Sequence, residues 1–424
     1  MTPLYAYYGD DFTGSTDVLE QLAEGGVPAV LFLRAPDAAL RARFPEARAI
    51  GLAGDSRSRS PAWMDANLPD AFAAIGDAAI LHYKTCSTFD SSPETGSIGR
   101  AMEIGARQFG GVVPILVGAP HLGRYVVFGN LFAVAGGDEV FRIDRHPTMA
   151  RHPVTPMHEA DLRRHLAAQT DMPIALVPID RIQAGAAPAL FDAVTEGAVL
   201  FDGIDMPSLA VAGELMQARG TRFAVGSSGV TRALVMAWQA SGVVAPPAPP
   251  ERAAEVDRML VVSGSCSPVT AAQIACGLAD GYVGVRADVP ALVRGESGEE
   301  ARLIDAANAA LENNGRCVIH SAEGPLGKTA PAAGDRLGAA LGRVALGAIR
   351  QHKLRRVLFA GGDTSSHGVA ELGIDALTWA APMERGAPLV RAHAAEPAVD
   401  GLELVLKGGQ MGGEGFFETV RRGR

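Results

Sequence analysis

Short runs of consecutive apolar residues recur along the chain, and small or polar clusters follow them. The apolar runs lie at residues 4–8, 27–33, 79–83, 112–117, 174–177, 259–262, 317–319, 357–359 and 402–406. They are continuous rather than alternating, which is typical of strands covered by helices on both faces. Apolar residues at helical spacing lie between them at 17–23, 162–168 and 337–349. The pattern predicts an α/β fold with largely parallel sheets.

A Pro/Ala-rich stretch interrupts this pattern near the middle of the chain. Residues 241–250 read Ser-Gly-Val-Val-Ala-Pro-Pro-Ala-Pro-Pro, which cannot form a helix interior or a central strand. The sequence therefore predicts two α/β domains, at residues 1–245 and 256–424, joined by a linker at 246–255.

Composition and charge narrow the class of protein. With 48% hydrophobic and 20% charged residues over 424 positions, the chain is neither disordered nor fibrous. The net charge of −9 argues against nucleic acid or an anionic membrane as the main partner. The four cysteines form no C-x-x-C pair or zinc spacing, and no basic leader or membrane-length apolar run is present. We expect a cytoplasmic protein with small-molecule partners; self-association into a homo-oligomer stays open.

The polar clusters that follow the predicted strands differ between the two halves. Those of the first half, at 9–15, 54–59 and 84–88, carry Asp, Arg and Lys. Those of the second half, at 263–267, 361–366 and 407–413, are rich in Gly and Ser. Ligands of open α/β sheets bind beyond the carboxyl ends of the strands, and backbone amides of such loops bind phosphate. We expect a polar substrate in the first half and a phosphate group in the second.

The pair Asp10-Asp11 follows the first predicted strand. An aspartyl-phosphatase site would need D-x-D spacing, because adjacent side chains point apart. We expect one carboxylate to act as a catalytic base or to bind a substrate hydroxyl, and the other to cap a helix that begins near residues 14–15. The sequence does not say which is which, and a purely structural role for both stays open.

A second polar group in the first half can bind a carboxylate. It consists of Asp55, Arg57, Arg59, Lys84 and Ser87. The arginine fork suits both oxygens of a carboxylate. The alternative is a solvated loop, which is favoured for Arg59. A structural role is likewise the default for His121 and Arg124, which follow another predicted strand.

Two glycine loops of the second half are candidates for phosphate binding. Gly361-Gly362-Asp363-Thr364 follows a predicted strand and precedes a short helix expected at 369–372. Glycines let the backbone approach a phosphate, and Asp363 could hold a magnesium-bound water or a ribose hydroxyl. The loop 407–413 contains Gly408 and Gly409. The alternatives are a tight strand-to-helix turn and a glycine-rich hairpin.

Residues 322–329 resemble a phosphate loop with Ala in the first position. That loop needs a helix that opens at its lysine, here Lys328, whereas the next helical pattern starts only near Asp335. Pro325 also removes an amide. We do not expect a phosphate loop of this kind here.

At these motifs the sequence resembles the four-carbon acid sugar kinase family. The segment Tyr8-Gly-Asp-Asp-Phe-Thr-Gly-Ser-Thr-Asp17 is similar to the family's Asp-Asp-Phe-Thr-Gly-Ala signature. Further similar segments occur in order along essentially the whole chain: Gly54-Asp-Ser-Arg57, Lys84 with Ser87-Thr88, Gly226-Ser-Ser-Gly229, Ser263-Gly-Ser-Cys-Ser267, Gly361-Gly-Asp-Thr364 and Leu406-Lys-Gly-Gly-Gln-Met-Gly412.

The resemblance implies an ATP-dependent kinase that phosphorylates the terminal hydroxyl of a small sugar acid, with Mg²⁺ as cofactor. It implies a sugar-acid-binding N-terminal domain, a nucleotide-binding C-terminal domain and an active-site cleft between them. Carried over by position, Asp10, Asp11, Arg57 and Lys84 are expected to bind the sugar acid, and Ser87 of the same polar group is added to them. The residues expected to bind ATP are Ser263, Gly361, Gly362, Asp363, Thr364 and Gly409, together with Ser265 and Gly408 of the same loops. No protein metal ligand is assigned.

The chain departs from the family pattern in the sugar half. Lys84-Thr-Cys-Ser-Thr-Phe-Asp stands where the family often has Lys-Ile-Asp-Ser-Thr-Leu-Arg. Lys407-Gly-Gly-Gln-Met-Gly412 also replaces the usual Lys-Ser-Gly-Asn-Phe-Gly. The first departure leaves the substrate open between a tetronate or 3-oxo-tetronate and a branched acid such as 3-oxo-isoapionate. A non-catalytic sensor of nucleotide or sugar acid is the alternative from another class.

Overall fold

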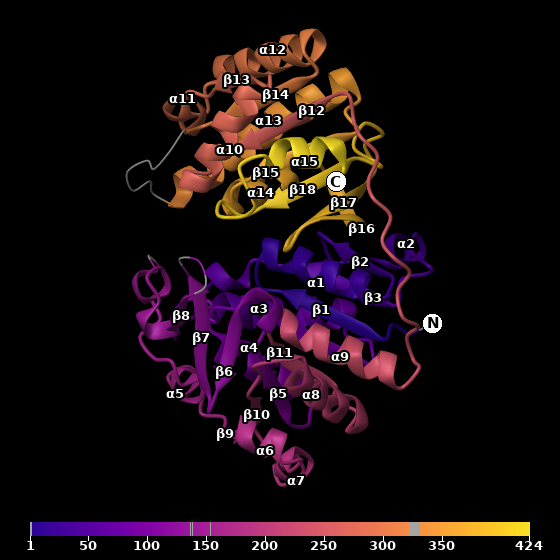
Figure 1. Cartoon of the computed structure of the whole chain (residues 1–424), viewed down its shortest axis with the longest axis vertical. Helices are drawn as coiled ribbons and strands as arrows, with labels where there is room; N and C mark the ends of the chain where they lie inside the picture. Colours follow the sequence, from indigo (N-terminus) through magenta and orange to yellow (C-terminus); the bar gives the residue numbers. More distant parts are fainter. Residues whose placement is uncertain (1, 136, 138, 153, 323–330) are drawn as a thin grey trace. The chain divides into compact units, whose positions relative to one another are not determined.

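The computed structural model describes residues 2–135, 137, 139–152, 154–322 and 331–424. The chain forms two compact units, Met1–Ala248 and Pro249–Arg424, and each is described by itself (Figure 1). Residues 245–256 have no regular secondary structure. Lys328 and most of the loop around it lie outside the described residues.

The sheet of the first unit has the strand order β2-β3-β1-β4-β11-β5-β10-β9, and all of its described pairings are parallel. Its strands are β1 (Tyr5–Gly9), β2 (Ala29–Phe32), β3 (Ala49–Ala53), β4 (Ile80–Lys84), β5 (Val113–Leu116), β9 (Ile174–Val177), β10 (Ala198–Phe201) and β11 (Phe223–Gly226). The central strands β1 and β4 are buried along their whole length. This burial explains their largely apolar sequences, and the predicted parallel α/β fold is confirmed.

Two groups of helices cover this sheet. The first group packs together and consists of α1 (Phe12–Glu24), α8 (Met206–Ala218) and α9 (Ser228–Ala240). The second consists of α3 (Pro61–Ile75) and α4 (Ile98–Phe109). Shorter helices are α2 (Ala38–Ala42), α5 (Leu162–Ala167), α6 (Ile179–Gln183) and α7 (Ala187–Asp192). The helix expected near residues 14–15 begins two residues earlier, at Phe12.

A separate antiparallel sheet follows β5, and the sequence pattern did not predict it. It consists of β6 (Arg124–Val127), β7 (Asn130–Ala135) and β8 (Glu139–Arg142). Its strands are only partly buried, so they lack the continuous apolar runs that mark the main sheet.

The second unit contains the parallel order β13-β14-β12-β15-β18. Its strands are β12 (Met259–Ser263), β13 (Val283–Arg286), β14 (Arg316–His320), β15 (Arg356–Ala360) and β18 (Glu403–Lys407), with β16 (Ile374–Glu384) and β17 (Ala387–Ala394) added in antiparallel orientation. Its helices are α10 (Pro268–Ala279), α11 (Val289–Arg294), α12 (Ser297–Asn313), α13 (Pro331–His352), α14 (Gly362–Ala370) and α15 (Phe416–Arg422). Figure 1 labels these elements from orange to yellow.

The helix after β15 lies earlier than the sequence predicts. It was expected at 369–372, but α14 begins at Gly362 and ends at Ala370. Gly361 has a φ of 118°, a conformation that glycine adopts readily, so the chain turns from strand into helix within one residue. The glycine loop is therefore the N-terminus of a helix rather than a spacer before it.

Candidate active site

Asp10 and Asp11 leave β1 at the carboxyl edge of the first sheet and make different contacts. Asp11 is the N-cap of α1, and its Oδ1 accepts a hydrogen bond from the Gly14 amide at 2.5 Å. Asp10 is buried, and its backbone amide donates to the Lys84 carbonyl at 2.9 Å. Its Oδ1 has no hydrogen-bond partner among the described residues. Asp11 is thus the capping residue, and the Asp10 carboxylate remains available to a ligand.

The electrostatic surroundings separate the two carboxylates further. Burial raises the pKa of Asp10 to about 7. The negative charge of Asp11 also raises this pKa, whereas the positive charges of Arg57 and Lys84 lower it. Burial would also raise the pKa of Asp11, but the Arg57 and Lys84 cations and the Gly14 amide outweigh it and lower that pKa. The pair titrates as a coupled system. A carboxylate with a pKa near neutrality is suited to accept a proton.

Arg57 follows β3, and its guanidinium joins two carboxylates. Nη1 donates to Asp11 Oδ2 at 2.6 Å, and Nη2 donates to the Asp90 oxygens at 2.8 and 3.1 Å. Arg57 was expected to bind the sugar acid directly. Both terminal nitrogens of its guanidinium are engaged within the protein, where they hold Asp11 and Asp90. Direct binding of the sugar acid by Arg57 stays a prediction.

Asp90 is a site residue that the sequence analysis missed. Its side chain is fully buried and accepts hydrogen bonds from the Thr88 and Thr155 hydroxyls at 2.5 and 2.7 Å. The preceding residue, Phe89, has a φ of 56°, which a bulky residue rarely adopts. Such strain persists where surrounding contacts enforce it, often at functional sites. The available signal was an Asp within the polar segment after β4; apart from Thr88, its partners Arg57 and Thr155 lie 33 and 65 residues away in sequence.

Lys84 ends β4 directly beside Gly9 in the sheet register and is buried. Its Nζ lies 2.7 Å from the position that a Cβ would take at Gly14, so a glycine there makes room for the ammonium. In the described part of the chain the ammonium makes no hydrogen bond. Ser87 lies half-buried in the same loop. Lys84 is thus a buried cation available to a ligand beside Asp10.

Two further buried hydroxyls lie at the same edge of the sheet. Thr85 Oγ1 follows β4 and Ser228 Oγ follows β11, the neighbouring strand, and both lack hydrogen-bond partners among the described residues. The Thr85 amide donates to the Gly226 carbonyl at 2.7 Å, which ties the two loops together. Buried polar atoms are normally hydrogen-bonded, so a set of unsatisfied ones indicates a site for a polar ligand. A ligand rich in hydroxyl groups fits this edge.

In the second unit, the loop after β18 packs on α10. Thr270 donates its hydroxyl to the Gly409 carbonyl at 2.8 Å, and Gln273 donates to the carbonyls of residues 411–413. A Cβ at Gly409 would lie 2.7 Å from Ser265 Oγ. The structure therefore brings together Ser265 and Gly409, which the sequence analysis placed in separate motifs.

The other predicted nucleotide residues lie at the same edge of the second sheet. Ser263 ends β12, and its buried Oγ has no partner among the described residues. The Gly361 amide donates to the Lys407 carbonyl at 2.9 Å. At Gly362 no atom of the described residues, apart from its chain neighbours and its own helix backbone, lies within 4 Å of the position that a Cβ would take. The side chains of Asp363 and Thr364 lie outside the described part. Gly408 precedes Gly409 in the loop after β18.

Lys407 supplies a buried cation in the second unit. It ends β18, and its Nζ donates to Thr270 Oγ1 at 3.0 Å. Burial lowers its pKa to about 8. In the sequence, Lys407 stands out only as the first residue of its glycine loop. A cation next to glycine loops at a helix N-terminus is suited to phosphate.

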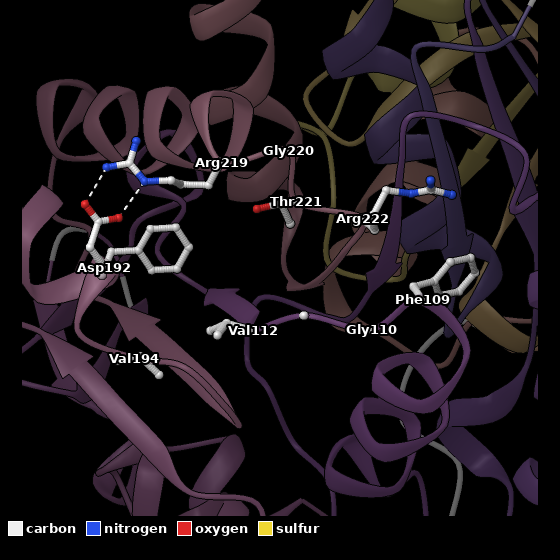
Figure 2. A pocket seen from close by; sticks show the side chains of 11 residues that line it. Phe109, Gly110, Val112, Asp192, Val194, Arg219, Gly220, Thr221 and Arg222 are labelled. Carbon is white, nitrogen blue, oxygen red and sulfur yellow. Dashed lines mark hydrogen bonds and ion pairs between the residues drawn. The ribbon is translucent and has the colours of Figure 1, made fainter.

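A cavity of about 310 Å³ lies at the opposite edge of the first sheet (Figure 2). It is lined by residues before β5 and β11, including Val112 and Arg222. Arg219, on its wall, is held by Asp192 at 2.5 and 2.7 Å (Figure 2). The cavity is thus separate from the edge that carries Asp10.

Among the described residues, His, Cys, Asp and Glu nowhere form a cluster of three or more that could hold a metal ion. The helices of the described part are too short or too polar to cross a membrane.

Comparison with known proteins relates both units to characterised families. Residues 5–234 match the model of a sugar-binding N-terminal domain, and residues 260–417 match that of a nucleotide-binding C-terminal domain. The chain is 48% identical to a 3-oxo-isoapionate kinase of Paraburkholderia graminis, over 99% of this chain and 94% of that one. It is 31% identical to a 3-oxo-tetronate kinase of Methylobacterium radiotolerans, over 96% of each chain. A solved structure from Salmonella typhimurium shares the fold, with a TM-score of 0.81 at 22% identity over 100% and 99% of the chains.

Proposed function

We propose that this chain, which belongs to the four-carbon acid sugar kinase family, transfers the γ-phosphate of ATP to a hydroxyl of a small sugar acid. The first unit binds the sugar acid and the second binds ATP. The observation that carries the proposal is the buried Asp10 carboxylate, with a pKa near 7 and an unpartnered Oδ1, at an edge lined by unsatisfied polar groups.

Each residue of the first unit has a distinct role in this proposal. Asp10 Oδ1 accepts the proton of the substrate hydroxyl as that oxygen attacks phosphorus. The buried Lys84 ammonium attracts the anionic substrate and neutralises charge beside Asp10. Arg57 fixes Asp11, so the first turn of α1 keeps its place. Thr85 and Ser228 bind hydroxyls of the substrate.

In the second unit, the α14 N-terminus and the loop containing Gly409 bind the phosphates through backbone amides. Lys407 adds positive charge behind that loop. Mg²⁺ would enter bound to the phosphates and would neutralise charge on the transferred group.

The substrate we favour is 3-oxo-isoapionate. The relative that acts on this branched acid is 48% identical to the chain, whereas the 3-oxo-tetronate kinase of Methylobacterium radiotolerans is 31% identical. Both relatives span nearly the whole chain, so the difference in identity is a like-for-like comparison.

A coupled ADP-release assay tests the function and the substrate together. The substrates are 3-oxo-isoapionate, 3-oxo-tetronates, threonate and erythronate at equal concentrations. We expect the highest kcat/KM with 3-oxo-isoapionate. A higher kcat/KM with a linear 3-oxo-tetronate would overturn the substrate assignment, and the absence of turnover on every sugar acid while ATP still binds would favour a sensor.

A further inference from the structure

A cavity of about 650 Å³ opens at the carboxyl ends of β13 and β14 in the second unit. It is lined by residues 286–290, Glu299, Arg302 and Ser321. Its volume falls within the range of small-molecule sites. None of the residues that the sequence analysis assigned to the nucleotide lines it.

The cavity adjoins the phosphate-binding edge through a direct contact. The Ser321 amide donates to the Ser263 carbonyl at 2.9 Å, so the cavity wall continues into the predicted nucleotide residues. The strands run in the order β13-β14-β12-β15, at about 4.8 Å per strand. Three such steps, about 14 Å, separate β13 from the strand that precedes Gly361. An extended nucleoside triphosphate covers that span with its phosphates at one end and its base at the other.

The lining has the chemistry of a site for a flat, mostly apolar ring. Val289 and Pro290 form an apolar wall at the start of α11. The Arg286 side chain is exposed and has no hydrogen-bond or ion-pair partner in the described part, so its planar guanidinium is free to stack on a ring. Ser321 Oγ is buried without a partner among the described residues and can pair with a polar ring atom.

Hydrogen bonds within the protein hold the wall of the cavity together. Arg302 donates to Glu299 at 2.7 Å and to the Arg286 carbonyl at 2.8 Å. Glu299 in turn accepts from the Asp288 amide at 2.8 Å. These contacts connect α12 to the segment that leaves β13, so the cavity is preformed and costs little ordering on binding.

We propose that this cavity holds the nucleobase of the phosphate donor, with Arg286 stacked on the ring and Ser321 Oγ bonded to its polar edge. The inference rests on the proposed function, because it takes ATP as the ligand of the second unit. The inference assigns a site to the nucleobase, the part of ATP that the glycine loops do not contact.

The test separates the base from the phosphates by using two probes, ATP and inorganic tripolyphosphate. Arg286→Ala and Ser321→Ala are compared with Arg294→Ala, whose arginine lies on α11, outside the cavity lining, and pairs with Glu296. We expect the first two variants to raise the Kd for ATP about tenfold, equivalent to about 1.4 kcal/mol, and to leave the Kd for tripolyphosphate unchanged. Arg294→Ala should change neither value.

The Ser321→Ala variant should fold like the wild type, because removal of a buried hydroxyl without a partner does not break a hydrogen bond. A loss of ATP binding in this variant therefore reports on the site and not on misfolding. An unchanged Kd for ATP in both variants would overturn the proposal, as would an equal loss of ATP and tripolyphosphate binding. If the wild-type protein binds neither probe, the proposed kinase function fails instead, so the two failures are distinguishable.

Discussion

Asp10 and Asp11 are neighbours in the chain, yet their carboxylates occupy opposite electrostatic situations. Asp11 accepts from the first turn of α1 and from Arg57, and these contacts lower its pKa. Asp10 is buried with one oxygen unpartnered, and its pKa is raised to about 7. The charge held on Asp11 helps to keep the proton affinity of Asp10 high. We infer that Asp10 is the base and that Asp11 is the residue that caps α1.

Asp10→Asn should lower kcat at least about 10²-fold with the Kd for ATP unchanged, because the amide cannot accept the hydroxyl proton. Asp11→Asn is the matched control, since it alters the adjacent carboxylate. It should keep most of kcat and lose about 1–2 kcal/mol of unfolding free energy with its ion pair. Steady-state kinetics and ATP titration measure the effects on activity. A near-normal kcat in Asp10→Asn would move the search for the base to Asp363.

Thermal unfolding of the same variant as a function of pH gives an independent check. The pKa of Asp10 in the folded protein lies above its ordinary value of 3.8, so the folded state binds the proton of Asp10 more tightly than the unfolded state does. The stability that this proton contributes is fully present below pH 3.8 and is lost as the pH rises through about 7. At pH 8 the wild type therefore carries a buried, unfavourable charge. Asp10→Asn should have a higher Tm than the wild type at pH 8, and this advantage should vanish by pH 4. A lower Tm of Asp10→Asn than of the wild type at pH 8 would contradict this prediction, because it would mean that the charge of Asp10 is compensated in the folded protein.

The activity of the wild type should have two pH limbs that belong to different substrates. kcat/KM for the sugar acid should fall as the pH drops below about 7, because protonated Asp10 cannot act as a base. kcat/KM for ATP should fall as the pH rises above about 8, because Lys407 then loses its charge. Lys407→Met should abolish the second limb and leave the first. A single limb common to both substrates would contradict this assignment.

Gly362→Leu should raise the KM for ATP at least about tenfold and leave the KM for the sugar acid unchanged, because its side chain enters the space that a phosphate needs. No described atom lies within 4 Å of the new Cβ position, so the Tm should change little. Gly415→Leu is the control, since that glycine also begins a helix in open space. An unchanged KM for ATP in Gly362→Leu would exclude the α14 N-terminus from phosphate binding.

Asp90→Asn should lower the free energy of unfolding by about 3 kcal/mol, because it removes one partner of a buried ion pair. The control Asp77→Asn removes an exposed pair with Arg41 and should cost less than about 1 kcal/mol. Urea unfolding at pH 7 measures both. If the Asp90 variant is as stable as the control, Arg57 does not depend on Asp90 for its position.

Local sequence determined the strands that continuous apolar runs mark, the turns that follow them and the chemical character of each half, but not the partly buried strands β6, β7 and β8. Apolar runs such as residues 174–177 became β9 with the same bounds. Fully buried strands such as β10 are apolar throughout because both of their faces are covered. The parallel topology then places the carboxyl ends of neighbouring strands at one edge, so polar loops that follow different strands meet there. The candidate residues Asp10 and Lys84 came together for this reason.

The tertiary structure decided which of these groups are free and which are already bound. Arg57 is paired with Asp90, and Asp90 with Thr155, across separations of 33 and 65 residues, and no local pattern encodes such partners. The same holds for Lys407 and Thr270, which are 137 residues apart. The proton affinities of Asp10 and Lys407 follow from burial, a property of the packed chain rather than of any segment. The sequence therefore determined which groups reach the site, and packing determined their charge and their availability.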